Sequence, residues 1–191
     1  MTRPTFTLIA GANGAGKSTL TSGNFSLFAS LPILDPDAIA KTIQTTVTAA
    51  SSIAAGRQVL EIAASHLSGS RSFAVETTLS GKNYLRMMLD ARAHGFEIVL
   101  VYIGTQAVEI NLDRIANRVL AGGHSVPEGD VRRRYRRSLQ NLTVAIPRSD
   151  HVILFDNSME EGYQLVGIID QGKPEWFWKT LPEWAIPLQQ I

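Results

Sequence analysis

The sequence predicts a single α/β domain built on a mostly parallel sheet with helices on both faces. Short apolar runs alternate with stretches of helical period along the chain. Strands separated by helices need crossover connections, and such connections give parallel strands. A glycine-rich segment also stands between the first apolar run, Phe6–Ala10, and the helix-compatible Lys17–Ser22. That is where a phosphate-binding loop occurs in such folds. A length of 191 residues fits one domain, over 1–191.

The expected elements follow one another in simple alternation. The expected strands are Phe6–Ala10, Pro32–Asp35, Phe73–Glu76, Glu97–Ile103, Val152–Asp156 and a weaker one at Gln164–Ile169. The expected helices are Lys17–Ser22, Asp37–Thr45, Ala54–Gly69, Gly81–Gly95, Ala107–Gly122 and Glu128–Ala145. Val59, Ala63 and Leu67 fall on one stripe, which marks the core face of their helix. Gly122 stands where a helix ends and Pro127 where the next begins.

The C-terminal segment, about 171–191, differs in composition from the rest. It holds all three tryptophans, with prolines among them. Aromatic side chains contribute large apolar area to a core, so we expect an irregular tail packed across the body rather than a ligand site.

Composition limits the classes of function. The formal net charge is +1, which gives no general electrostatic reason to expect nucleic acid or an anionic membrane as partner. The chain has no cysteine, which excludes disulfides and thiolate chemistry. No apolar run approaches the ~20 residues of a membrane helix, and the start of the sequence lacks a signal-peptide pattern. We therefore expect a cytoplasmic protein.

The segment GANGAGKST, Gly11–Thr19, fits the phosphate-binding pattern G-x-x-x-x-G-K-[ST]. Glycines let backbone N–H groups converge on a polyphosphate without Cβ atoms in the way. Lys17 would reach the β- and γ-phosphates and Ser18 would ligate Mg²⁺, while the next helix directs its N-terminus at the anion. The expected ATP·Mg²⁺ site comprises Gly11, Ala12, Asn13, Gly14, Ala15, Gly16, Lys17, Ser18 and Thr19.

Polar residues follow the carboxyl ends of the expected strands, where ligands bind in such sheets. Asp35 and Asp37 follow the second strand, and Glu76 ends the third, with Thr78 and Ser80 after it. Phosphoryl transfer needs a carboxylate that takes the proton of the acceptor hydroxyl. Asp37 is our candidate for that general base, although either aspartate could instead cap a helix. Glu76 or Asp35 is a further candidate for the metal site.

An arginine-rich stretch lies beyond the fourth expected strand. Arg114 and Arg118 lie one helical turn apart, followed by a Gly-Gly-His segment and an arginine run that includes Arg134. Three interpretations remain open: a basic helix for nucleic acid, a solvated helix face, or a mobile lid over about 107–145. The low net charge does not favour nucleic acid. On the lid hypothesis, Arg114 and Arg118 contact ATP, while Arg118 and Arg134 assist catalysis.

Taken with the loop, five further motifs resemble the zeta toxin family of P-loop kinases. They are Asp-Pro-Asp-x-Ile-Ala, Glu-Thr-Thr-Leu-Ser-Gly, Gly-Gly-His-x-Val-Pro-Glu, Arg-Arg-Tyr-x-Arg-Ser-Leu-x-Asn-Leu and Asp-Asn-Ser, within about Phe6–Ser158. The resemblance implies a three-layer α/β/α P-loop kinase-like fold with a helical lid. Characterised zeta toxins phosphorylate a sugar hydroxyl of UDP-N-acetylglucosamine. The resemblance therefore implies an ATP-dependent phosphotransferase with a small-molecule alcohol acceptor, and an antitoxin as partner.

The resemblance also implies roles for individual residues. Lys17 and Ser18 match the family's loop lysine and Mg²⁺ hydroxyl, and Asp37 matches its catalytic base. Glu76 and Thr78 match the acid and the threonine of its substrate-binding turn.

Two positions fit the family pattern less closely. Glu61 matches a substrate-contacting glutamate only after a one-residue gap, and it could instead form an i,i+4 pair with Arg57. Ser80 stands where the family turn carries an arginine. A sugar-nucleotide diphosphate would lack one cationic partner there, although we still count Ser80 among the substrate-binding candidates.

The chain is similar, more narrowly, to a bacterial branch of this family labelled ABC-type ATPase. Leu79-Ser80-Gly81 resembles the signature of transporter ATPases, but those follow it with a strand that ends in Asp-Glu. Here Glu97–Ile103 is followed by Gly104-Thr105, so we reject a transporter ATPase. The alternative to a kinase is a non-kinase NTPase, or a nucleotide-dependent module that binds nucleic acid or protein through its arginines.

Overall fold

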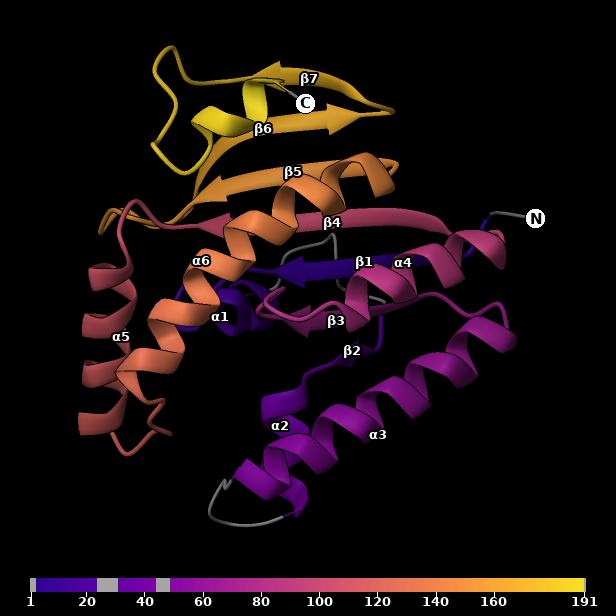
Figure 1. Cartoon of the computed structure of the whole chain (residues 1–191), viewed down its shortest axis with the longest axis horizontal. Helices are drawn as coiled ribbons and strands as arrows, with labels where there is room; N and C mark the ends of the chain where they lie inside the picture. Colours follow the sequence, from indigo (N-terminus) through magenta and orange to yellow (C-terminus); the bar gives the residue numbers. More distant parts are fainter. Residues whose placement is uncertain (1–2, 24–30, 44–48, 191) are drawn as a thin grey trace.

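The computed structural model describes residues 3–23, 31–43 and 49–190. Its centre is a seven-stranded sheet in the order β2-β3-β1-β4-β5-β6-β7 (Figure 1). The strands are β1 (Thr5–Ala10), β2 (Ile33–Leu34), β3 (Phe73–Thr77), β4 (Glu97–Gly104), β5 (His151–Asp156), β6 (Gln164–Asp170) and β7 (Lys173–Trp176). The strands β2, β3, β1, β4 and β5 pair in parallel, whereas β6 and β7 are antiparallel. The predicted α/β class with a mostly parallel sheet is confirmed.

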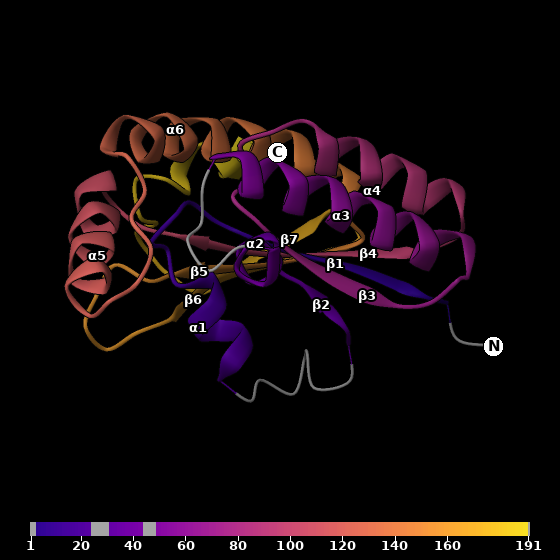
Figure 2. The same cartoon turned by 90° about the horizontal axis from the view of Figure 1, so that it is seen from below.

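The helices cover the two faces of the sheet unequally. They are α1 (Lys17–Ser22), α2 (Pro36–Ile43), α3 (Ala49–Ser68), α4 (Asn83–Ala93), α5 (Val108–Leu120) and α6 (Glu128–Ala145). Helices α3, α4 and α6 lie on one face, α1 lies on the other, and α5 stands beyond the carboxyl ends of the strands (Figure 2). The last residues of the predicted helix Asp37–Thr45 fall outside the described residues. None of the helices in the described ranges has the length and apolar character needed to cross a membrane.

Both faces of the sheet carry an apolar core because strand side chains alternate between the faces. Phe6 and Leu8 of β1 are buried on the α3, α4 and α6 side, where Val59 and Ala63 of the predicted stripe meet them. Ile9 is buried on the α1 side, in a smaller cluster of buried side chains.

The C-terminal segment contains a strand that the sequence analysis did not predict. Asp170 pairs with Lys173, and the two residues between them, Gln171 and Gly172, have φ values of 47° and 77°. Positive φ at both central residues is the geometry of a tight hairpin turn, which returns the chain as β7. The rest of the segment packs on the body as expected, because Trp184 lies in the main core.

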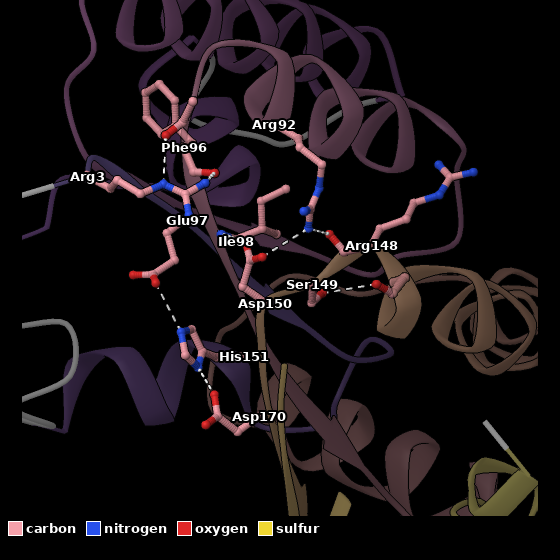
Figure 3. A network of polar contacts seen from close by, with 12 residues as sticks. Arg3, Arg92, Phe96, Glu97, Ile98, Arg148, Ser149, Asp150, His151 and Asp170 are labelled. Carbon is pink, nitrogen blue, oxygen red and sulfur yellow. Dashed lines mark hydrogen bonds and ion pairs between the residues drawn. The ribbon is translucent and has the colours of Figure 1, made fainter. Parts of the chain in front are cut away.

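A polar network links β4, β5 and β6 at the end of the sheet opposite the phosphate loop (Figure 3). Nε2 of His151 on β5 lies 3.1 Å from Oε1 of Glu97 on β4, and its Nδ1 lies 2.6 Å from Oδ1 of Asp170 on β6. Burial disfavours the charged imidazole, but the hydrogen bond and charge of Glu97, together with Asp170, outweigh it and raise the pKa of His151. Asp150 adds a bond to the Ile98 amide at 2.8 Å.

Candidate nucleotide and acceptor site

The phosphate loop joins β1 to α1 and lies close against neighbouring elements. Gly14 has φ 79°, and a Cβ there would come within 2.6 Å of the Asn111 carbonyl oxygen of α5. Gly16 has φ 105°, and a Cβ there would come within 2.5 Å of Nδ2 of Asn157, after β5. Backbone conformation and close approach therefore both require glycine at these two positions. The remaining loop glycine, Gly11, donates its N–H to the Thr77 carbonyl of β3 at 3.2 Å.

Lys17 is held inside this loop. Its Nζ donates to the Ala12 carbonyl at 3.2 Å. Burial lowers the pKa of Lys17, while the carboxylates of Glu76, Asp37 and Asp35 act in the opposite direction. The charges of three acidic side chains that follow β2 and β3 therefore act on the loop lysine.

Glu76 at the end of β3 joins the first turn of α1. Its Oε2 accepts a hydrogen bond from Ser18 Oγ at 2.9 Å, and its Oε1 accepts one from Thr21 Oγ1 at 2.6 Å. Burial raises the pKa of Glu76, and the two hydroxyls counteract that shift. A hydroxyl beside a carboxylate is a donor set that suits Mg²⁺, which takes few protein ligands and completes its sphere with phosphate and water. Sequence reasoning missed Thr21, although it lies one helical turn after Ser18 and so on the same face.

Asp35 and Asp37 differ in their surroundings. Asp35 Oδ1 accepts the Asp37 N–H at 2.9 Å, and the Asp35 carbonyl accepts the Ile39 N–H at 3.0 Å. Asp35 therefore has the capping geometry that the sequence left open for both aspartates. Asp37 lies in the first turn of α2 with an exposed side chain that has no hydrogen-bond partner within the described ranges.

Thr78 and Ser80 form the turn after β3. Their hydroxyls are 2.9 Å apart. Leu79 between them has φ 53°, an uncommon value for a branched residue, and Asn141 of α6 donates Nδ2 to its carbonyl at 2.7 Å. Glu61 is exposed on α3 and makes no ion pair with another described residue.

An open groove runs between α3 and α4 beside this turn. Two adjoining hollows of about 250 and about 370 Å³ share Leu60 and Asn83. The larger hollow is also lined by Arg57 and Tyr84. Burial, together with a smaller effect of the Asp35 charge, raises the pKa of Tyr84 to about 12. The charge of Asp35, after β2, therefore acts on this end of the groove.

The three arginines of the lid hypothesis have different contacts. Arg134 donates Nη1 to Asn13 Oδ1 at 3.1 Å, at the tip of the phosphate loop. Arg118 is exposed and donates Nη2 to the His124 carbonyl at 2.8 Å. Nη1 of Arg114 is buried and has no partner among the described residues. A guanidinium nitrogen without a partner is costly, and an anion would satisfy it.

Two loop contacts come from residues to which the sequence analysis gave no role. Tyr163 donates its hydroxyl to the Gly16 carbonyl at 2.7 Å, and Asn157 donates Nδ2 to the Ala15 carbonyl at 2.9 Å. Burial raises the pKa of Tyr163, and the Thr19 hydroxyl counteracts that shift. Asn157 stands in the Asp-Asn-Ser motif and could have been noticed there. Tyr163 lies in a loop with no periodic or motif signal.

A family model described as Zeta toxin matches residues 1–163, which is most of the chain. The chain belongs to the zeta toxin family. The match covers the phosphate loop, the residues after β2 and β3, and the whole α5–α6 region, so the motifs that suggested the resemblance all lie within it.

One protein sequence and two solved structures are also similar to this chain. An uncharacterized protein of Haemophilus influenzae is 40% identical over 125 residues, which cover 65% of this chain and 88% of that protein. The PezAT toxin–antitoxin system of Streptococcus pneumoniae matches with a TM-score of 0.65 and 15% identity, over 88% of this chain and 72% of that chain. The AvrRxo1-ORF1:-ORF2 complex with ATP matches with a TM-score of 0.72 and 20% identity, over 99% of this chain and 63% of that chain. At these identities the two structures show that the α/β fold is shared.

Proposed function

We propose that this chain is an ATP-dependent kinase that transfers the γ-phosphate to a hydroxyl of a small metabolite. One observation carries the proposal: among the acidic side chains whose charges act on the loop lysine, Asp37 is exposed and has no hydrogen-bond partner among the described residues. An acidic residue with only a structural role at the start of a helix would cap that helix, and Asp35 already has the capping geometry. Asp37 is therefore free to orient an acceptor hydroxyl and take its proton.

The nucleotide half of the proposal rests on the loop and its neighbours. Lys17 would exchange its bond to the Ala12 carbonyl for the β- and γ-phosphates. Ser18 and Glu76 would hold Mg²⁺, which neutralises charge on the phosphates. Arg114, with a buried donor that lacks a partner, would bind phosphate oxygen, and Arg118 and Arg134 would join it when the α5–α6 region closes as a lid.

UDP-N-acetylglucosamine is our first candidate for the acceptor. The groove between α3 and α4 leads away from the acidic residues after β2, with Glu61 on the neighbouring surface of α3 and Thr78 and Ser80 at the turn after β3. Ser80 supplies no positive charge, but Arg57 lines the larger hollow and could meet a diphosphate. We include a cytoplasmic location and an antitoxin partner in the proposal, the latter because a toxin–antitoxin system is among the structural neighbours.

Two arginines of the run do not favour the nucleic-acid form of the non-kinase alternative. Arg132 pairs with Glu109 and Glu128, both at 2.8 Å, and Arg133 pairs with Asp130 at 2.6 Å. Arginines neutralised by neighbouring carboxylates make a poor surface for nucleic acid.

The test is a transfer assay with mass spectrometry. The protein is incubated with Mg·ATP and UDP-N-acetylglucosamine, and in parallel with a bacterial metabolite extract, with Lys17→Ala as control. A metabolite that gains one phosphate with wild type only is the expected result. ATP consumption with no phosphorylated product in either mixture would contradict the kinase and favour the non-kinase NTPase. Transfer to a metabolite of the extract but not to UDP-N-acetylglucosamine would show that the acceptor is a different metabolite.

A further inference from the structure

Four buried polar side chains lie beneath the phosphate loop and take no part in the proposed chemistry. Each has a relative exposure of 7% or less: Thr105, Asn111, Asp156 and Asn157. Buried polar groups are costly unless they are hydrogen-bonded, and every member of this set is. Their bonds form two branches that both reach the loop.

The first branch runs through the turn after β5. Asn157 donates Nδ2 to the Ala15 carbonyl at 2.9 Å, and its own N–H is bound to the Gly104 carbonyl at 2.9 Å. Asp156 fixes the same turn, because its Oδ1 accepts the Ser158 N–H at 2.9 Å. The other oxygen of this carboxylate, Oδ2, accepts Nε1–H of Trp184 at 2.7 Å.

The second branch runs through the end of β4. Thr105 donates Oγ1 to Oδ1 of Asn111 at 2.5 Å, and Asn111 donates Nδ2 to the Asn13 carbonyl at 2.8 Å. The residue before Thr105 is Gly104, and a Cβ there would come within 2.2 Å of the Trp184 ring. The indole therefore lies directly against the backbone of Gly104, next to the residue that starts the second branch, and it is hydrogen-bonded to the first.

We propose that Trp184 is a positioning residue of the nucleotide site. It lies beyond residue 163, where the family match ends, in the C-terminal segment that folds back over the carboxyl end of β4. Its indole fixes the turn after β5 and the end of β4, and these hold the carbonyls of Ala15 and Asn13 away from the phosphates. The loop amides then point inward before ATP arrives, which lowers the ordering cost of binding. The inference rests on the nucleotide-binding half of the proposed function.

The test separates affinity from stability. Trp184→Phe keeps an aromatic ring against Gly104 but removes the N–H that binds Asp156. We expect the Kd for Mg·AMP-PNP, measured by calorimetry well below the melting temperature, to rise about tenfold, because a buried hydrogen bond to a charged group is lost. The matched control is Trp178→Phe in the same segment, whose indole has no hydrogen-bond partner in the described part of the chain. Its Kd should equal that of wild type.

A second variant makes the result independent of how well Trp184→Phe folds. Asp156→Asn keeps the acceptor for the Ser158 N–H but presents an amide to Trp184, so it should weaken binding to a similar extent. The double variant should be no weaker than either single one, since both remove the same bond. Additive losses, or a lower melting temperature with an unchanged Kd, would overturn the proposal.

The outcome is distinguishable from failure of the kinase proposal. Wild type that binds AMP-PNP but phosphorylates no metabolite would refute the kinase and leave the positioning role supported or refuted by the variants alone. Equal Kd values for wild type and Trp184→Phe would refute the positioning role whatever the transfer assay shows.

Discussion

The nucleotide half and the acceptor half of the site are built differently. The phosphate loop is held by bonds from buried or half-buried side chains of α5 and of the loop after β5, which reach the carbonyls of Asn13, Ala15 and Gly16. On the acceptor side, Asp37 and Glu61 are exposed and have no hydrogen-bond partner in the described part of the chain. A rigid loop suits a ligand of fixed geometry, whereas free side chains can adjust to an acceptor. This difference predicts that loop variants lose nucleotide chemistry altogether, while acceptor-side variants lose transfer but keep ATP binding.

The largest effect is expected at Lys17. Lys17→Ala removes the cation that meets the β- and γ-phosphates, so ATP turnover should fall by about 10³-fold while the circular dichroism spectrum and melting temperature stay close to wild type. Lys179→Ala, an exposed lysine of the C-terminal segment, is the control. Full turnover and tight Mg·ATP binding by Lys17→Ala would contradict the assignment of Gly11–Thr19 as the nucleotide-binding loop.

Asp37→Asn tests whether the acceptor side supplies the general base. The amide cannot accept the proton of the acceptor, so phosphoryl transfer should fall by at least about a hundredfold. ATP affinity, measured by calorimetry, should not change. Asp113→Asn, at an exposed aspartate of α5 to which no role is assigned, is the matched control. Near-normal transfer by Asp37→Asn would move the search for the base to Glu76 or Asp35.

Arg118 tests whether the α5–α6 region acts as a lid. In this structure it bonds to the His124 carbonyl, and its charge also acts on Lys17. If it meets the phosphates only after closure, Arg118→Ala should lower kcat by about tenfold with a smaller change in ATP affinity, because the contact strengthens as charge develops. Arg133→Ala, paired with Asp130, serves as control. Equal losses in kcat and affinity would indicate ordinary ground-state binding.

Substitution of Arg57 tests whether the groove binds the diphosphate of the acceptor. Arg57→Ala removes the charge that would meet a diphosphate, so the KM for UDP-N-acetylglucosamine should rise about fivefold, the effect of one exposed ion pair. The KM for ATP should be unchanged, and the exposed Arg136 provides a matched Arg→Ala control. An unchanged acceptor KM would place the diphosphate elsewhere.

The smallest effect is expected far from both halves, at His151. Its pKa is raised in the folded state, so its contribution to stability is present below the unfolded value of about 6.5 and is lost as pH rises through the folded pKa. The imidazole is partly exposed, so His151→Gln should cost less than about 1 kcal/mol of unfolding free energy at about pH 5.5. Urea titrations should find no difference from wild type at about pH 8.5. A larger loss at the higher pH would contradict the charged pairing.

Residue periodicity and one motif were enough to predict most of the fold and the phosphate loop. The parallel core and the helices between its strands follow from the alternation of apolar runs and helical stretches. Glu76, Asp35 and Asp37 could be named as site candidates because the ends of parallel strands meet at one edge. The network under the loop was not predictable in this way. Asn111, Asn157 and Trp184 are far apart in sequence and meet only through packing, and a buried asparagine in a helix looks like any surface asparagine in the sequence. The hairpin at Gln171-Gly172 was missed because glutamine seldom adopts a positive φ.

The two edges of the sheet have a consequence for self-association. At one edge, β2 contributes only two residues, and at the other, β7 contains Pro174, which has no N–H to offer. Lys173 adds a charge at the start of the same strand. Short, proline-bearing and charged edges resist the strand-to-strand pairing that seeds aggregation. Copies of this chain that accumulate in a cell would therefore be protected from joining their sheets into fibrils while each remains folded.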